Sequence, residues 1–377
     1  MHRTDVTNGY AELAARQAPP VSSPACGYTV DFERLKPPIR WRALPLFAPL
    51  ALLAAGVVLI AVVSLGLGHY PLTPVQVLDI LWSSISGGSS EQPPVAVKVL
   101  LTVRLPRIAA AMLVGASLAA AGAVYQTLFR NPLASPAILG VSAGAGFGAA
   151  LGMLLHAGVL AIQLSAFTGG VVAVAAVVLI AWRMGQGSSL VLVLSGMVVS
   201  ALFQALTSAL KYVADPLDTL PAIVFWLLGG LGRVGAADLA WAAPLAIAGM
   251  AALFALRWPT QVLEAGDDEA RTMGVPVRQM RALLVLLATL VTAAAVSISG
   301  IVGWVGLLVP HLARLLVGSA YARLLPVSIL MGAGYLLLVD DLCRSAFTSE
   351  LPLGIVTAVL GAPVFVAVLM KVRRQWS

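Results

Sequence analysis

Two groups of charged side chains stand out in this sequence. The first contains three arginines, Arg104, Arg107 and Arg344, far apart in the chain. If they are exposed on the outer face of a membrane, such basic groups can pair with acidic groups of a partner protein and steer its approach. Lipid headgroups or nearby acidic side chains could engage the same arginines instead, and the sequence leaves both readings open. The acidic candidates are Asp340, Asp341 and Glu350.

The second group lies in the segment 258–281, the longest charged stretch between apolar runs. Its middle part favours a helix that ends at Gly274. A short helix lying along the membrane surface would suit the docking of a separate motor protein, whereas a solvated connector is the alternative. The residues that we expect to take part are Leu263, Glu264, Gly266, Asp268, Glu269, Ala270 and Gly274.

Motifs for enzymatic chemistry are missing from the sequence. It has no G-x-x-x-x-G-K-[ST] phosphate loop, no zincin motif, no G-x-S-x-G elbow and no Cys/His metal spacing. Cys26 and Cys343 fit neither a disulfide framework nor a zinc site. His311 is the best lone titratable candidate, with a structural hydrogen-bonding role expected. We therefore predict no enzymatic activity, no metal site and no cofactor in this chain, and a lipid-modifying enzyme is disfavoured.

The elements that carry these side chains are indicated by composition. The chain has 377 residues, of which 60% are hydrophobic and only 10% charged. Soluble domains carry about 25% charged residues. Long apolar runs of about 20 residues are typical of transmembrane helices, and the absence of strand alternation argues against an outer-membrane barrel. The net charge of +7 is better explained by arginines in loops on one side of a membrane than by nucleic-acid binding.

We predict ten transmembrane helices, preceded by a largely disordered tail over residues 1–43. The membrane domain covers 44–371, and 372–377 form a short end. A further piece at 216–231 is expected to be a partial or interfacial helix. The ten predicted spans are 44–67, 105–129, 135–156, 159–182, 189–212, 236–256, 282–299, 301–318, 324–342 and 352–370.

The positive charges predict the orientation of these spans. With both termini placed inside, 17 lysines and arginines fall inside and 6 outside. Short loops rich in Lys and Arg stay in the cytoplasm. We therefore expect a multi-pass protein of the bacterial inner membrane with both ends cytoplasmic.

Small residues predict how the helices pack. Close backbone approach stabilises helix pairs in lipid, and small residues permit it. We expect packing ridges at Gly115 in the second span and along the third span. A nucleotide fingerprint at 144–148 is disfavoured because no strand precedes it. The third-span ridge consists of Gly140, Gly144, Gly148 and Gly152, and plausible helix hinges lie at Pro310, Pro326 and Pro363.

Three long stretches, in order along the chain, resemble the FecCD permease family of iron–siderophore, haem and cobalamin importers. The first contains Arg104-Leu-Pro-Arg107 and Gln126-Thr-Leu-Phe-Arg-Asn-Pro-Leu-Ala134. The second is Gly303-Trp-Val-Gly-Leu-Leu-Val-Pro-His-Leu-Ala-Arg314, and the third runs from Glu350 to Pro363. The resemblance covers about residues 45–374.

This resemblance implies an all-α, cobalamin-importer-permease-like bundle that works as a homodimer by alternating access, with the path at the dimer interface lined mainly by the fifth span. Two cytoplasmic ATPase subunits would use ATP and Mg, and a periplasmic binding protein would deliver a metal chelate. The 262–275 loop resembles the family's coupling helix, and the three arginines resemble its docking arginines. The cytoplasmic gate would involve Asn131, Pro132, Leu133, Ser188 and Ser189.

The cargo is left open by the sequence. The third span begins Ala134-Ser-Pro rather than with the form common in haem and cobalamin permeases, and Asp340-Asp341 replaces a more usual single acid. These departures favour an iron–siderophore over haem or cobalamin, and molybdate or tungstate is the alternative. A proton-coupled secondary transporter is less favoured because acidic or histidine relays at mid-membrane are missing.

Overall fold

The computed structural model describes residues 45, 47–68, 70–88, 92–184, 189–346 and 350–373. All of the secondary structure within them is helical, as predicted. The predicted tail, 1–43, and the end, 374–377, lie outside the described residues. The main helices are α2 (Phe47–Gly66), α3 (Pro74–Ser86), α5 (Leu105–Leu128), α6 (Val141–Leu154), α7 (Val159–Arg183), α8 (Ser189–Val213), α9 (Thr219–Leu228), α10 (Ala236–Ala255), α13 (Val277–Ser299), α14 (Val305–Val317), α15 (Tyr321–Ser345) and α16 (Leu353–Arg373).

Helices occupy all ten predicted spans. Among the described residues, seven are long and apolar enough to cross a membrane: α2, the continuous stretch Pro94–Leu128 that ends in α5, α7, α8, α10, α13 and α15. The apolar parts of α6, α14 and α16 are shorter. The predicted partial helix at 216–231 is α9, which has only 10 residues.

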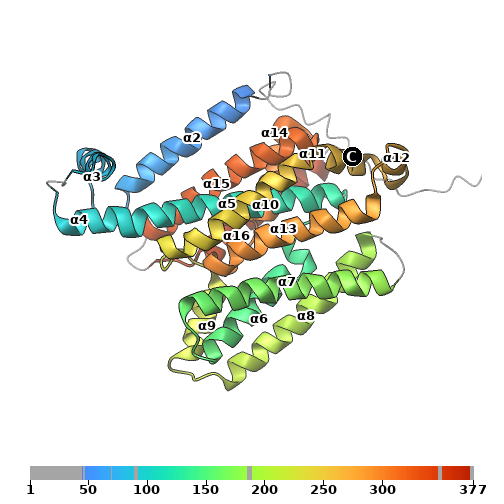
Figure 1. Ribbon diagram of the computed structural model, residues 1–377, viewed down its shortest axis with the longest axis horizontal. Helices are drawn as coiled ribbons and strands as arrows, with labels where there is room; N and C mark the ends of the chain where they lie inside the picture. The colour runs from blue at the N-terminus through green and yellow to red at the C-terminus, as the bar shows by residue number, and fades with distance from the viewer. Residues whose placement is uncertain are drawn as a thin grey trace, which may run out of the picture. The chain divides into compact units, whose positions relative to one another are not determined.

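Helix α5 lies at the centre, with α10, α13, α14 and α15 around it (Figure 1). In the most apolar 18 residues of the stretch Pro94–Leu128, which ends in α5, 89% of the residues are buried. The corresponding share is 22% in α2 and in α10. Small side chains make this possible. A Cβ added to Gly115 would overlap the carbonyl oxygen of Gly332 in α15, and one on Gly122 would overlap that of Gly306 in α14. Backbones in such close contact exclude lipid from α5.

Helices α6, α7, α8 and α9 are grouped together on one side of α13 in Figure 1. Gly144 and Gly148 of α6 face α7, where an added Cβ would overlap the carbonyl oxygens of Gly169 and Ser165. At Gly152 an added Cβ would lie 3.2 Å from the Cα of Ile162, also in α7. These three glycines form the predicted ridge.

Gly140 does not belong to that ridge. It lies in a turn between the 3₁₀-helix η4 (Pro136–Leu139) and α6, with φ +80°, a conformation that glycine adopts without strain. An added Cβ there would lie 3.0 Å from Ser200 Oγ in α8. The third predicted span, 135–156, is therefore occupied by two helices, η4 and α6, which this turn separates.

The polar segment before the second span is more helical than predicted. Helix α3 was missed, although Thr73 and Gln76 form a capping box at its start. The second span also begins earlier than expected, at α4 (Pro94–Lys98), and runs through a π-helix, η3 (Val99–Arg104), into α5. Pro106 has no N–H to donate, and the π-helix ends just before it, where Leu105 N donates to the carbonyl oxygen of Leu100.

Candidate functional site

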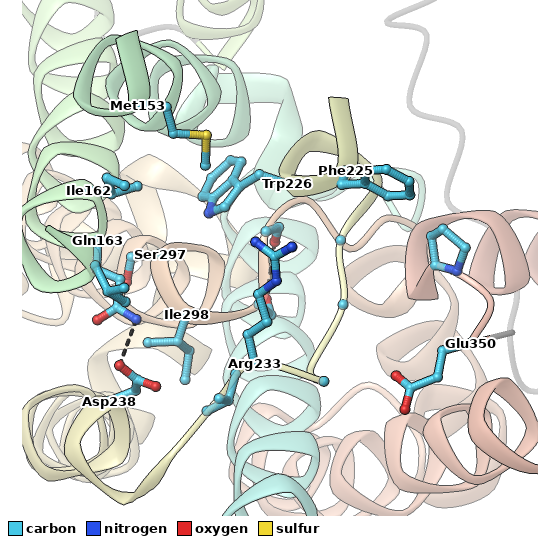
Figure 2. Close-up of a pocket in the computed structure, with 18 of the residues that line it drawn as sticks. Met153, Ile162, Gln163, Phe225, Trp226, Arg233, Asp238, Ser297, Ile298 and Glu350 are labelled. Carbon is cyan, nitrogen blue, oxygen red and sulfur yellow. Dashed lines mark hydrogen bonds between the residues drawn. The ribbon is translucent and has the colours of Figure 1, made fainter. Parts of the chain in front are cut away.

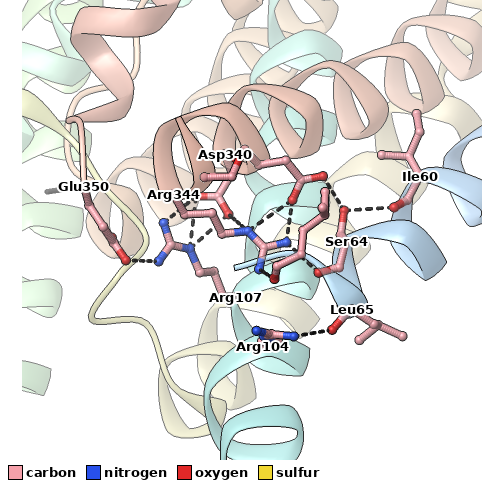
Figure 3. A network of polar contacts seen from close by, with 11 residues as sticks. Ile60, Ser64, Leu65, Arg104, Arg107, Asp340, Arg344 and Glu350 are labelled. Carbon is pink, nitrogen blue, oxygen red and sulfur yellow. Dashed lines mark hydrogen bonds and ion pairs between the residues drawn. The ribbon is translucent and has the colours of Figure 1, made fainter. Parts of the chain in front are cut away.

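The three arginines predicted to be exposed for docking are buried instead. The relative exposure is 4% for Arg104, 6% for Arg107 and 4% for Arg344. They lie together where the end of α2, the start of α5 and the end of α15 meet (Figure 3). The expectation of exposed docking groups was therefore wrong, and local pairing, the alternative that the sequence left open, is what the structure contains.

Each arginine has partners within the chain. Arg107 donates from Nε to Asp340 Oδ2 at 2.9 Å and from Nη1 to Glu350 Oε1 at 2.8 Å. Arg344 pairs with Asp341 and donates to the carbonyl oxygen of Ser64.

Arg104 donates to backbone carbonyl oxygens of Leu65 and Tyr70 instead of to an acid. The Arg107–Asp340 pair and the bonds from Arg104 and Arg344 to backbone carbonyl oxygens tie the ends of α2, α5 and α15 to one another. Because Asp340 is fully buried and its contact with Arg344 is 3.9 Å long, loss of Arg107 would leave its charge poorly compensated in an apolar environment.

A cavity of about 490 Å³ lies beside this cluster (Figure 2). It is bounded by the ends of α6, α7, α9, α10 and α13 and by the segment that precedes α16. On one wall, Gln163 donates to Asp238 at 2.8 Å and accepts from Trp241 Nε1 at 3.0 Å. Arg233 extends into it next to Trp226. Sequence reasoning missed this site because its lining comes from six separate segments; only the Gly235–Asp238 capping spacing was a local signal.

The charged segment contains two short helices, α11 (Arg257–Ala265) and α12 (Asp267–Thr272). Its last part, 277–281, belongs to α13 and not to the loop. Gly266 separates the two helices with φ +154°, and an added Cβ there would overlap the carboxylate of Glu269. Leu263 and Ala270 are buried and anchor the segment in the core, whereas Asp268 and Glu269 are exposed. Gly274 follows α12 in a left-handed turn.

Asp267 of this segment is half-buried and pairs with Arg281 of α13 at 2.8 Å, and Glu264 is half-buried as well. Its Oε1 lies 3.2 Å from Arg314 Nη1 of α14. Burial raises the pKa of the Glu264 carboxyl, and the neighbouring Arg314 acts against that rise. His311, one turn before Arg314, is also buried, and its ring nitrogens have no hydrogen-bond partner in the described part of the chain. The hydrogen bond predicted for His311 is therefore not found among the described residues.

The predicted gate residues lie in two places. Asn131, Pro132 and Leu133 form the turn after α5, in which Asn131 Oδ1 accepts from Leu133 N at 2.9 Å. Ser189 is the first residue of α8, whereas Ser188 lies outside the described residues.

Helix α8 leaves a broad apolar face uncovered. Leu194, Val198 and Leu202 are 47%, 67% and 56% exposed. Large exposed apolar faces are typical of contacts with lipid or with another protein.

Apolar helices around a buried central helix, with a charged helical segment between two spans, define a multi-helix membrane permease. The chain belongs to the FecCD transport family, whose model matches residues 56–371. This membership accounts for the order of the three motifs along the chain.

Named relatives carry different cargoes. The chain is 40% identical over 317 residues to the molybdate import system permease protein MolB of Haemophilus influenzae, covering 84% of this chain and 94% of that protein. It is 43% identical over 278 residues to the cobalamin import system permease protein BtuC of Halobacterium salinarum, covering 74% of each. With the hemin transport system permease protein HmuU of Yersinia pestis the identity is 35% over 286 residues, 74% of this chain and 85% of that one.

A solved structure has the same fold. It is described as "An inward-facing conformation of a putative metal-chelate type ABC transporter", and the match has a TM-score of 0.77 and 38% identity. The match covers 85% of this chain and 98% of that chain.

Proposed function

We propose that this ABC importer permease of the FecCD family moves a metal chelate, with an iron–siderophore favoured, from the periplasm to the cytoplasm. It would act as a homodimer in the bacterial inner membrane, with both termini cytoplasmic. A periplasmic binding protein would deliver the cargo, and two cytoplasmic ATPase subunits would use ATP and Mg. The observation that carries this proposal is the likeness to a metal-chelate type transporter over 85% of the chain.

The uncovered face of α8 supports the homodimer. It is apolar, and a second copy packed against it would remove Leu194, Val198 and Leu202 from lipid. Most oligomers of one chain are two-fold symmetric, so the same face of both copies would meet. A path between two such faces would be largely neutral, which suits a bulky chelate.

The charged segment supports coupling to a separate ATPase. The exposed carboxylates of Asp268 and Glu269 face away from the core, while buried Leu263 and Ala270 fix the segment to the bundle. A push on α12 would therefore reach the packed helices. Transport then requires that nucleotide binding stabilise one arrangement of the bundle more than the other.

Molybdate is the second candidate cargo. It is favoured by the 40% identity to a molybdate permease over 94% of that protein's length. Molybdate is a small compact dianion, whereas an iron chelate is much larger. A neutral path through the permease would not distinguish the two, so the binding protein would have to recognise the cargo by its size and charge. The cargo is therefore decided most directly by the protein that delivers it.

The test is reconstitution of the permease with its ATPase and binding protein in liposomes. We expect uptake that needs ATP and the binding protein and that survives an uncoupler. Binding of a ferric siderophore or of molybdate to the binding protein, measured by calorimetry, separates the two cargoes. An ATPase subunit with its phosphate-loop lysine replaced is the control. Uptake driven by a proton gradient without ATP would refute the proposed function.

A further inference from the structure

Within the described residues, one ion pair connects the charged segment to α14, and another, between Asp267 and Arg281, connects α12 to α13. Glu264 of α11 and Arg314 of α14 approach to 3.2 Å, with side-chain exposures of 26% and 6%. The other neighbours of α11 lie mainly in α5 and α15, and its buried residues there are apolar. Arg314 Nε has no hydrogen-bond partner in the described residues, so Glu264 is the group that compensates this buried charge.

Helix α14 is held tightly at its other end. The carbonyl oxygen of Gly306 lies where a Cβ on Gly122 of α5 would be, and Gln126 Nε2 donates to the carbonyl oxygen of Leu307 at 2.9 Å. Pro310 lies between this fixed turn and Arg314. Because proline cannot donate to the carbonyl four residues earlier, the helix bends most easily there.

The fixed end of α14 also contacts the segment that leads to α8. A Cβ on Gly306 would lie 2.7 Å from Pro136 Cδ in η4. Two residues further on, the carbonyl oxygen of Ile138 lies where a Cβ on Gly196 of α8 would be. Close contacts thus connect α14, η4 and α8, and the Glu264–Arg314 ion pair joins α11 to this series. Close-packed interiors transmit displacement because they have little room to absorb it.

We propose that the Glu264–Arg314 ion pair is the positioning element that passes the displacement of α11 and α12 to α14, and from there through η4 to α8. This inference rests on the proposed function, because it assumes that an ATPase acts on α12. It assigns a role to the arginine that ends the Gly303–Arg314 motif: Arg314 holds α14 to the moving segment. The break at Pro310 lets the Arg314 end follow that segment.

The experiment compares transport with ATP hydrolysis in the reconstituted complex. Glu264→Gln removes the charge but keeps the shape. The control is Asp218→Asn, which removes an exposed carboxylate outside the charged segment. We expect Glu264→Gln to lower the cargo moved per ATP by about fivefold or more, while basal hydrolysis persists. Asp218→Asn should leave the ratio within about twofold, because an exposed carboxylate outside the charged segment contributes little.

A double variant separates coupling from folding. Glu264→Gln alone leaves Arg314 buried and unpaired, which lowers stability. Glu264→Gln with Arg314→Gln removes both charges, so stability should recover while the transport ratio stays low. Recovery of the ratio together with stability, or an unchanged ratio in Glu264→Gln, would overturn the inference. Failure of the wild-type complex to show ATP-dependent uptake would instead overturn the proposed function.

Discussion

Replacing Arg107 by glutamine is expected to destabilise the protein strongly. Arg107 is buried and engages Asp340, which is fully buried, and Glu350, whose side chain is 47% exposed. When one partner of a buried pair is removed, the other remains as an uncompensated charge, at a cost of about 3–5 kcal/mol. The contact with half-exposed Glu350 adds little, because solvent screens it. Within the described part of the chain, Asp340 would keep only its longer, 3.9 Å contact with Arg344, so most of the loss should come from the poorly compensated charge of Asp340.

The assay is equilibrium unfolding of the purified permease in detergent. Arg107→Gln and Asp340→Asn should each lower the free energy of unfolding by about 3–5 kcal/mol. The double variant, which has no unpaired buried charge, should lose less than either single variant. Arg271→Gln is the control, since its pair with Asp268 is exposed and worth at most about 1 kcal/mol.

Two results would refute this reasoning. One is an Arg107→Gln variant that is as stable as Arg271→Gln. The other is a double variant whose loss of unfolding free energy equals the sum of the two single losses, because the effects of independent sites add and those of a coupled pair do not.

The same variants test docking. If buried Arg107 only holds helices together, a folded protein that carries both Arg107→Gln and Asp340→Asn should bind the binding protein as the wild type does.

Three further predictions use other parts of the fold. Gly122→Ala should lower the free energy of unfolding by about 1–3 kcal/mol, because its Cβ would overlap a carbonyl oxygen of α14. Gly56→Ala should leave the free energy of unfolding unchanged, because no other atom of the described residues lies near its added Cβ. A proline in place of Arg271, beyond the first turn of α12, should leave the bundle folded but abolish the stimulation of hydrolysis by loaded binding protein, because it removes a hydrogen bond of the helix and clashes with the preceding turn; intact stimulation would count against coupling there. A Val198→Cys permease should form a crosslinked dimer in membranes, whereas Leu52→Cys on the exposed face of α2 should not; equal crosslinking would argue against a dimer through α8.

The sequence by itself determined the helical, membrane-embedded class and the family. Apolar runs with few charges leave only helices as spanning structures, because backbone polar groups in lipid must be paired within the segment. Glycine spacing also indicated the packing face at Gly144 and Gly148, since residues four apart share one face of a helix. These features depend on neighbours within a few residues, so they can be read along the chain.

Only the tertiary structure decided which charged side chains are buried and which of them form pairs. Arg107 and Asp340 are separated by 233 positions, and Glu264 and Arg314 by 50, so no local pattern tells whether either pair forms. An arginine near a helix end is exposed or buried according to which other helix ends meet it. The close approach of Ser200 in α8 to the turn at Gly140 likewise joins segments that are far apart in the chain. Burial and pairing are properties of the packed helices, and for that reason the sequence identified the arginines but not their surroundings.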